Sequence, residues 1–578
     1  MIKLLRYLKV FKKEVTLGPI FKLIEAMFEV IVPLVMASII DIGIGNKDIH
    51  YVFKMGGVMI LLGVTGLVCA LICQYFAAKA SQGVGTIMRN ELFAHINTLS
   101  HTELDRIGTP SLITRLTNDV NQLQVAVAML IRLAVRVPFL IIGSFIMAMM
   151  LDVKLSLIFI VVIPIIAIII YCVMSRSIPY YKKIQGKLDR IGLITRENLE
   201  GIRVIRAFSK QKYENNRFEA ASDDLMTASI KVGKISALLN PLTYLVMNFA
   251  IIAILWCGGI RINEGIMSQG EIIAFVNYMT QILLALMVLA NLVIIFTKAA
   301  AAAQRVNEVF ETNSSIKDAK EIHTEERSNE NSLVEFKNVS FAYKDTNEYA
   351  IKNISFKVKK GEMIGIIGGT GSGKSTLVNL IPRFYDATEG EILVEGINVK
   401  DYPLQVLRKQ IGVVPQNVVL FAGTIRENLK WQQENATDED ITKGLEIAQA
   451  LEFVKELPEG YDTPVLQGGK NFSGGQRQRL TIARGLVGNP KILILDDSAS
   501  ALDYVTESKL RKALKERTRE MTTFIVSQRI SSIKHADQII VLDDGEVVGI
   551  GSHDNLLKEC NVYKEICLSQ LSNDKEVK

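Results

Sequence analysis

The feature that most constrains this chain is a series of six long apolar stretches, all of which lie before residue 297. They run approximately over residues 17–44, 52–76, 127–151, 155–173, 241–260 and 272–296. An α-helix needs about 20 apolar residues to cross the roughly 30 Å hydrocarbon core of a bilayer. The sequence therefore predicts six membrane-spanning helices, and a purely soluble protein is excluded.

The distribution of positive charge predicts how these spans are oriented. Among the links between spans, the two long polar segments, about 77–126 and 174–240, carry most of the Lys and Arg residues, whereas the short links carry few. By the positive-inside rule, both termini and the long segments lie in the cytoplasm. The basic, amphipathic start MIKLLRYLKVFKKEV is typical of an interfacial helix rather than a signal peptide. The net charge of +6 comes without a basic run that alternates with aromatic residues, so no nucleic-acid partner is expected.

Several ionisable residues interrupt the apolar spans. Glu25 and Glu29 share one face of span one, together with Lys22, and Arg132 and Arg136 share one face of span three. Ionisable groups at this depth usually face the interior of a helix bundle or an aqueous cavity. We expect one of these acids and one of these arginines to face the inside of the bundle, with snorkelling to the cytoplasmic surface as the alternative.

After residue 333 the chain has the charge density and glycine content of a soluble α/β domain. An apolar strand leads into GGTGSGKS (Gly368–Ser375), which fits G-x-x-x-x-G-K-[ST] between a strand and a helix start. Such a loop wraps phosphates with its backbone N–H groups, Lys374 reaches the β- and γ-phosphates, and Ser375 binds Mg²⁺. Downstream, KILILDD is a second apolar strand that ends in Asp496, a further Mg²⁺ ligand. The cofactors expected are therefore ATP and Mg²⁺.

Between these two motifs, NFSGGQRQRL (Asn471–Leu480) resembles the signature sequence of ATP-binding-cassette transporters. The resemblance extends over nearly the whole chain and implies a six-helix transmembrane domain of the exporter type, fused to an α/β P-loop ATP-binding cassette. Within it, Tyr343 matches an aromatic that stacks on adenine, Gln416 the glutamine loop and a metal ligand, and Asp503 the D-loop. The nucleotide-binding residues so implied are Tyr343, Gly368, Thr370, Gly371, Ser372, Gly373, Lys374, Ser375, Thr376, Gln416, Ser473, Gly474, Gly475, Gln476 and Asp503.

The resemblance also implies a mechanism that needs two cassettes. Each ATP lies between the P-loop of one cassette and the signature of the other, so a second half-transporter is the expected partner. The segments 109–120 and 196–208 resemble the two intracellular regions whose turn helices dock on the cassettes. Closure around ATP draws the helices together and turns the membrane cavity outward.

Two positions depart from the family pattern at the catalytic end of the site. Asp497 stands where the family carries the Glu that acts as general base, and Gln528 stands where it carries His. The signature FSGGQ is intact, with Phe472 for the usual Leu, and Gln467 replaces a Glu common in exporters. Asp497 and Gln528 are the catalytic candidates, and we expect this chain's site to hydrolyse ATP slowly. The chain is therefore predicted to be the degenerate half of a heterodimer, with a homodimer of slow sites as the alternative.

The sequence thus predicts a transmembrane domain over 1–312, a linker over 313–332, a cassette over 333–570 and a polar tail over 571–578. The expected function is ATP-driven export of hydrophobic or amphipathic molecules, as in multidrug exporters, across the cell membrane. Lipid or peptide export, import on the exporter fold, and a regulatory subunit that uses ATP only as a switch remain alternatives. The residues do not identify the substrate.

Overall fold

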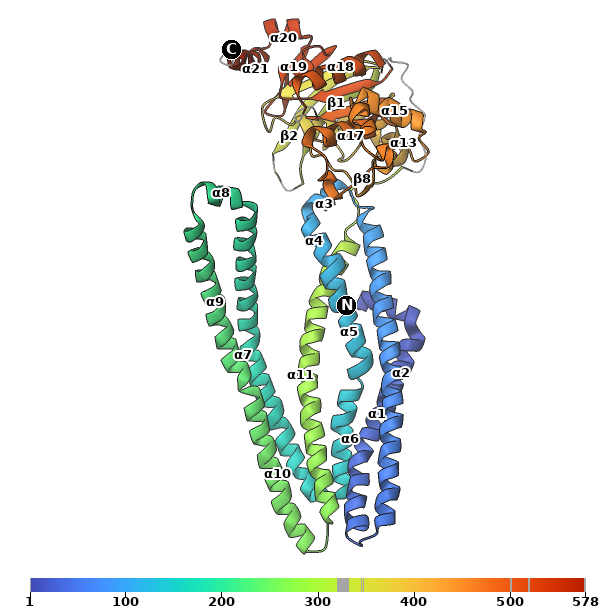
Figure 1. Ribbon diagram of the computed structural model, residues 1–578, viewed down its shortest axis with the longest axis vertical. Helices are drawn as coiled ribbons and strands as arrows, with labels where there is room; N and C mark the ends of the chain where they lie inside the picture. The colour runs from blue at the N-terminus through green and yellow to red at the C-terminus, as the bar shows by residue number, and fades with distance from the viewer. Residues whose placement is uncertain are drawn as a thin grey trace. The chain divides into compact units, whose positions relative to one another are not determined.

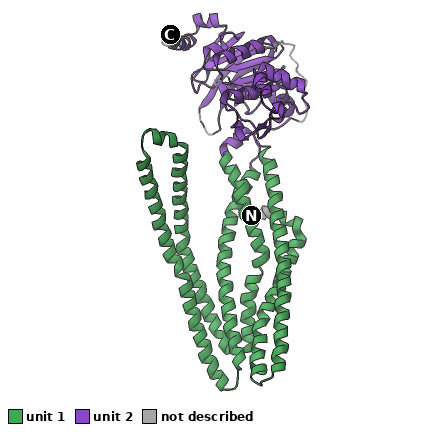
Figure 2. Ribbon diagram, viewed as in Figure 1, with its two compact units in different colours: residues 1–97, 109–311 green, residues 98–108, 312–578 purple. Residues whose placement is uncertain are grey.

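The computed structural model describes residues 2–319, 332–344, 346, 348–498, 502–517 and 520–575. Most of the expected linker over 313–332, and the last residues of the expected tail over 571–578, lie outside the described residues. The chain divides into two compact units (Figure 2). We call residues 1–97 with 109–311 the membrane unit, and residues 98–108 with 312–578 the cassette unit.

The membrane unit is entirely helical (Figure 1). In chain order its helices are η1 (Ile2–Phe11), α1 (Lys12–Ser38), η2 (Ile39–Ile44), α2 (Ile49–Ile96), α4 (Thr109–Thr114), η3 (Arg115–Asp119), α5 (Val120–Leu133), α6 (Arg136–Leu151), α7 (Val153–Glu200), α8 (Ile202–Ala207), α9 (Gln211–Ala237), α10 (Leu239–Asn263) and α11 (Gln269–Glu311). Six helical segments are long and apolar enough to cross a membrane, which confirms the six predicted spans. At 1.5 Å per residue, the 48-residue α7 is roughly 72 Å long and extends well beyond a bilayer of about 30 Å.

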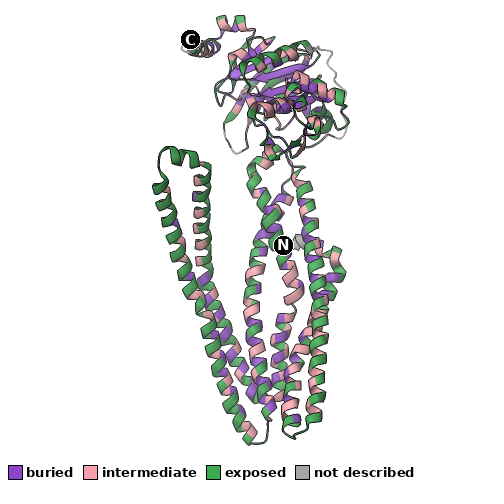
Figure 3. Cartoon of the chain, in the orientation of Figure 1, coloured by how far each residue is buried: buried purple, intermediate pink, exposed green. Residues whose placement is uncertain are grey.

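Many residues on the outer faces of these helices are exposed (Figure 3), and a large number of them are apolar. On α2, for example, Phe53 and Ile60 are 76% and 70% exposed. Such a surface suits hydrocarbon rather than water, because lipid tails are as apolar as these side chains and can surround them without a free-energy penalty. The interior is built mainly from α11 and α7, where Phe275, Tyr278 and Phe159 are completely buried.

Span three is broken, although its sequence predicted one continuous helix. The α-helical hydrogen bonding stops at Leu133 and resumes at Arg136. Pro138 explains the break, because it has no N–H to donate to the carbonyl of Ala134 four residues earlier. The two arginines of this span therefore lie on either side of a helix discontinuity.

The membrane charges form specific pairs. Arg136 donates to both carboxylate oxygens of Glu29 at 2.7 and 3.1 Å, which links α6 to α1 and confirms that these two side chains face each other. Glu25 instead pairs with Lys22 of its own helix at 2.7 Å. At the opposite end of the bundle, buried Asp152 caps α7 by accepting from the N–H of Leu155 and forms an ion pair with Arg261 of α10.

The cassette unit is an α/β domain. Its helices are α3 (His101–Ile107), α12 (Lys374–Leu380), η4 (Val399–Asp401), α13 (Leu404–Lys409), α14 (Ile425–Leu429), α15 (Asp438–Ile447), α16 (Leu451–Lys455), η5 (Gly460–Asp462), η6 (Gln467–Gly469), α17 (Gly474–Leu486), α18 (Tyr504–Arg517), α19 (Ile530–Ile533), α20 (His553–Glu559) and α21 (Asn561–Lys575). Its strands are β1 (Ser332–Ala342), β2 (Tyr349–Lys359), β3 (Met363–Gly368), β4 (Glu389–Val394), β5 (Ile397–Asn398), β6 (Ile411–Val414), β7 (Gly423–Thr424), β8 (Pro464–Val465), β9 (Ile492–Asp496), β10 (Thr522–Val526), β11 (Gln538–Asp543) and β12 (Glu546–Gly551).

A six-stranded sheet in the order β12-β11-β3-β10-β9-β6 forms the centre of this unit. Its five strands from β11 to β6 are parallel, and β12 joins antiparallel at one edge. Side chains alternate between two cores: Phe524 lies in one and the next residue, Ile525, in the other. Both faces of the sheet are therefore covered, as parallel sheets require. An antiparallel sheet, β2-β1-β4-β5, contributes to the same core as Phe524.

Candidate functional site

Four parallel strands end at the same edge of the central sheet and deliver the candidate residues there. β3 ends at Gly368 and runs into the P-loop, and β9 ends at Asp496. β10 ends at Val526 and β6 at Val414, just before Ser527 and Gln416 respectively. Ligands of open α/β sheets bind outside the carboxyl ends of the strands, and this is where the sequence motifs meet.

The P-loop has the backbone conformation that its glycines allow. Gly371 and Gly373 have φ angles of +84° and +91°, a region that disfavours residues with a Cβ. A Cβ on Gly373 would also lie only 2.6 Å from the carbonyl oxygen of Ala350. The loop therefore needs glycine at this position for two independent reasons.

Lys374 lies inside the loop that it closes. Its ammonium donates to the carbonyl oxygens of Gly368 and Gly369 at 3.0 and 2.5 Å. Burial lowers the pKa of Lys374, and the nearby carboxylates of Asp497 and Asp496 oppose that shift. A buried ammonium that donates to neutral oxygens can exchange them for phosphate oxygens, which stabilise its charge more strongly.

Ser375 and Asp496 lie together below the loop. The Ser375 hydroxyl donates to the Asp496 carboxylate at 2.9 Å. Burial raises the pKa of Asp496, and the hydrogen bond from Ser375 partly offsets this rise. A hydroxyl, a carboxylate and the nearby amide oxygen of Gln416 are hard oxygen ligands, so this donor set fits Mg²⁺.

A cavity of 360 Å³ lies over these residues. Its lining is Tyr343, Ala350, Thr370, Gly371, Gly373, Lys374, Ser375, Thr376, Gln416, Asp496, Asp497, Val526, Ser527 and Gln528. Most candidates of the sequence are thus brought together. Gly368 and Ser372 lie behind the cavity wall, where Ser372 is 4% exposed. The described residues that line this cavity do not include Asp503 or the signature residues Ser473–Gln476.

Sequence reasoning missed three of the lining residues, namely Ala350, Val526 and Ser527. None of the three belongs to a sequence motif, because only the folding of the sheet brings these residues beside the P-loop. The register of β10 with β3 could have identified Val526, which pairs with Ile366. A further detail is that the hydroxyls of Tyr343 and Thr376 are 3.0 Å apart, which orients the tyrosine at the cavity.

Asp497 has an unusual backbone. Its φ is +45°, in the left-handed region that Asp tolerates better than most residues. Its N–H donates to the carbonyl of Val526 at 3.0 Å, which fixes the position of the Cα. Burial raises the pKa of Asp497, and Arg529, Lys374 and a hydrogen bond from Gln416 oppose this rise. Gln528, on the same side of the cavity, is exposed.

The signature forms a second, separate helix start. Ser473 caps α17 in a capping box with Gln476: the serine hydroxyl accepts from the Gln476 N–H at 3.3 Å. Gly474, in the first turn, is exposed, and a Cβ there would meet nothing within 4 Å. Phe472 is 8% exposed and belongs to the cassette core, which explains why a large apolar residue is needed there.

One intracellular region differs from its prediction. The segment expected to dock on a cassette was 109–120, but this segment belongs to the membrane unit. The preceding residues 98–108, with helix α3, belong to the cassette unit instead. Asp105 accepts a 2.7 Å hydrogen bond from Tyr385, and the ring of His101 lies 4.7 Å from that of Phe384. The docking segment therefore ends at Gly108, whose φ of +79° marks the turn into the next helix.

A P-loop cassette that follows six membrane-spanning helices in one chain defines a class of protein: a transporter driven by a nucleotide. The comparisons with known proteins identify the family. Residues 15–287 match the ABC transporter transmembrane region and residues 351–500 match the ABC transporter model. The chain belongs to the ABC transporter family, and its fused domains make it an exporter half-transporter that hydrolyses ATP.

Relatives match the chain along nearly its full length, and a solved structure shares its fold. The chain is 39% identical over 574 residues to a Bacillus subtilis protein named "Uncharacterized ABC transporter ATP-binding protein YfiB", covering 99% of each chain. It is 32% identical over 558 residues to the "ATP-dependent lipid A-core flippase" of Pasteurella multocida, covering 96% of this chain and 95% of the relative. The structure of a bacterial Atm1-family ABC exporter with ATP bound shares the fold, with a TM-score of 0.80, 22% identity, and coverage of 97% of this chain and 99% of that one.

Proposed function

We propose that this protein is the degenerate subunit of a heterodimeric exporter that moves hydrophobic or amphipathic small molecules, such as drugs or lipids, out of the cell. In this proposal the chain lies in the cell membrane with both termini and the cassette in the cytoplasm. The domains run over 1–312 and 333–570, joined by the linker over 313–332. The single observation that carries the proposal is the pair Asp497 and Gln528, set at an otherwise complete nucleotide site.

The nucleotide site is proposed to bind Mg·ATP. Lys374 and the P-loop N–H groups hold the phosphates, and Tyr343 stacks on the adenine. Ser375, Gln416 and Asp496 hold Mg²⁺, which neutralises phosphate charge when it is bound. The 360 Å³ cavity and the hydrogen bond between Ser375 and Asp496 support these roles.

The hydrolytic end of the site is proposed to be impaired. A general base must hold water in line with the γ-phosphate, and a carboxyl that is one methylene shorter stands too far back. A displacement of about 1 Å can lower the rate about a hundredfold. The fixed backbone of Asp497 supports this argument, because its hydrogen bond to Val526 prevents the Cα from advancing. Gln528 cannot become cationic or carry a proton as His does.

The intact signature supports the need for a partner. Ser473 and Gly474 form an exposed helix start, where backbone N–H groups favour an anion. In our proposal they meet the phosphates of the nucleotide on the partner's P-loop. The partner is accordingly expected to carry Glu and His at its own catalytic positions and an altered signature.

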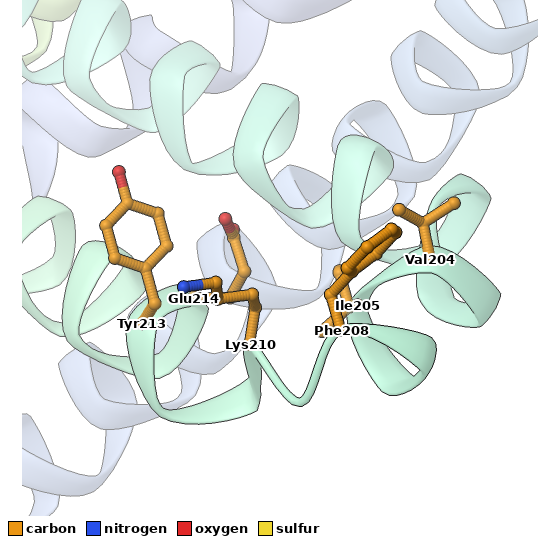
Figure 4. A pocket seen from close by; sticks show the side chains of 6 residues that line it. All are labelled: Val204, Ile205, Phe208, Lys210, Tyr213 and Glu214. Atoms are coloured by element: carbon orange, nitrogen blue, oxygen red, sulfur yellow. The ribbon is translucent and has the colours of Figure 1, made fainter.

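A second surface also fits a partner cassette. Around helix α8, the side chains of Val204, Ile205 and Phe208 lie together at one side of a cavity of 510 Å³, and Lys210, Glu214 and Tyr213 line the rest of it (Figure 4). Val204 is 60% exposed and Phe208 is 71% exposed, although this end of the unit lies beyond the membrane in our orientation. An apolar turn exposed to water is typical of an interaction site. We propose that the other half-transporter's cassette covers it.

The substrate class rests on the bundle. Its interior is apolar, and its charged side chains are largely compensated, as in the Glu29–Arg136 pair. Relatives named lipid A-core flippases make a lipid one concrete candidate for this chain. Lipid or peptide export and import on the same fold are the alternatives. The direction of transport in inside-out vesicles separates export from import.

The test of the proposal compares the chain alone with the chain purified together with its partner. We expect ATP turnover and transport only from the pair. In the pair, neutralising the partner's catalytic Glu should abolish activity, whereas Asp497→Asn should leave most of it. Robust ATPase activity and transport from the lone chain would support the homodimer instead. A pair that hydrolyses ATP without moving any amphiphile would support a regulatory subunit.

A further inference from the structure

The chain passes between the membrane unit and the cassette unit at three places. These are the junctions 97/98, 108/109 and 311/312. On the membrane side, they adjoin the end of α2, the start of α4 and η3, and the end of α11. Every covalent path from the cassette into the membrane helices therefore runs through these three helix ends.

Two ion pairs cross between η3 and α11 directly beside these junctions. The guanidinium of Arg305 holds the carboxylate of Asp119 with two hydrogen bonds, of 2.8 and 2.5 Å. In the reverse direction, Arg115 forms an ion pair of 2.9 Å with Glu308 and donates to the carbonyl of Arg305 at 3.1 Å. We call Arg115, Asp119, Arg305 and Glu308 the cytoplasmic brace.

The third helix end is tied to the same place. A ring nitrogen of His95, in the last turn of α2, lies 3.0 Å from the carbonyl oxygen of Val309. The His95 ring also packs against Phe310, with their centroids 5.8 Å apart. All three helix ends are thus joined within two turns of α11, between Arg305 and Phe310.

The brace is unusual in its burial and in its backbone. Asp119 and Arg115 are only 2% and 9% exposed, so each depends on its partner for compensation of its charge. A buried ion pair adds little net stability compared with apolar packing, and its best-attested use is to fix register. The segment Arg115–Asp119 is a π-helix, and its first and last residues form the hydrogen bonds and ion pairs with α11. Such π-turns in α-helices are frequent at functional positions.

We infer that the cytoplasmic brace couples ATP-driven movement of the cassette to the membrane helices, with its four residues acting as positioning residues. It locks the register between η3 and α11, so that the helix ends move together. Without the brace, displacement of one end is absorbed as sliding between the helices. ATP would still bind and be hydrolysed, but less of the movement would reach the opposite end of the bundle.

The experiment measures ATP turnover and helix movement in the same complex. Spin labels replace Asn46 and Glu264, exposed residues in the α1–α2 and α10–α11 turns, in a background without native cysteines. Pulsed electron paramagnetic resonance gives the distance between them, with and without Mg·ATP and vanadate. The variants are Arg305→Gln, Arg305→Lys and Asp119→Asn. The matched control is Lys298→Gln, which removes the same charge from an exposed position of α11.

We expect Arg305→Gln and Asp119→Asn to keep ATP turnover within about twofold, while the population that shifts in distance falls at least about fivefold. Arg305→Lys should be intermediate, because lysine keeps the charge but not the two-pronged geometry. Lys298→Gln should behave as the wild type. An unchanged distance shift in both neutralised variants would overturn the inference. The inference would also be overturned if ATP turnover, the distance shift and the melting temperature all fell together and Arg305→Lys restored none of them.

If a buried variant fails to fold, Glu308→Gln decides the question, because the Glu308 side chain is 62% exposed and glutamine keeps its size and its hydrogen-bonding oxygen. A reduced distance shift at normal turnover supports the brace, and an unchanged shift contradicts it. None of these readouts requires a transported substrate or depends on which subunit carries the slower site.

Discussion

Asp497→Glu tests whether one missing methylene limits hydrolysis at this chain's own site. The backbone at this position cannot adjust, because the Asp497 N–H is bonded to the Val526 carbonyl at 3.0 Å and the strand β9 before it is fully buried. The longer side chain alone can therefore bring the carboxylate about 1 Å closer to the attacking water. A displacement of this size can change the rate about a hundredfold. A hundredfold gain corresponds to about 2.7 kcal/mol of activation free energy.

The new residue also carries a cost. Glu is less at ease than Asp at a φ of +45°, and the strain should lower folding stability by about 1 kcal/mol. The strain is the same in the ground state and in the transition state of hydrolysis, so it does not raise the activation barrier. We expect a rise of about tenfold to a hundredfold in hydrolysis at this site, and a further rise when Gln528→His is added.

The assay must isolate one site. In the complex with the partner, the partner's catalytic carboxylate is neutralised, and single-turnover release of radiolabelled phosphate is then measured. Asp497→Asn sets the baseline, and Asp554→Glu, an exposed position on α20, is the matched control for the added methylene. If neither Asp497→Glu nor its combination with Gln528→His is faster than the unaltered chain, side-chain reach does not limit this site.

Three further outcomes follow from the structure. Gly373→Ala should abolish retention of Mg·ATP, measured by equilibrium binding, because its Cβ would lie 2.6 Å from the Ala350 carbonyl oxygen. Arg261→Ala should lower the free energy of unfolding by about 3 kcal/mol in thermal unfolding, because it leaves Asp152 buried and unpaired. Burial alone would raise the pKa of Glu103, but hydrogen bonds and a nearby ammonium hold that pKa below its ordinary 4.5. The ionised Glu103 carboxylate therefore stabilises the cassette unit at pH values above 4.5. Stability should fall as the pH drops below about 4.5, and Glu103→Gln should flatten that part of the pH profile.

The sequence predicted the features that depend on local chemistry. The number of spans follows from apolar length alone, and the P-loop follows from a spacing of glycines that few other structures need. The carboxyl-end position of Asp496 followed from the apolar strand before it. The physical cause of each of these features lies within a segment of about 20 residues, so each could be predicted without knowledge of the fold.

Long-range pairing was beyond such reasoning. The sequence placed two acids and two arginines in these spans but did not say which would pair. In the structure Arg136 pairs with Glu29, whereas Glu25 forms its ion pair with Lys22. Likewise, nothing in the local pattern of 98–108 distinguishes a helix of the cassette from an amphipathic membrane extension. Its placement depends on Tyr385 and Phe384, which lie some 280 residues later in the chain.

That placement has a consequence for biosynthesis. The cassette unit includes residues 98–108, yet the rest of it begins at residue 312. A ribosome that adds about 5–20 residues per second makes helix α3 roughly 14–56 s before it makes Phe384 and Tyr385, some 280 residues later. During that interval, the His101 ring and the Asp105 carboxylate lack their later partners Phe384 and Tyr385. A cassette expressed from residue 312 onward lacks α3 in turn, and leaves Phe384 and Tyr385 uncovered. Nascent chains should therefore be most sensitive to chaperones and proteases before the cassette is complete, even though their membrane helices have already been inserted.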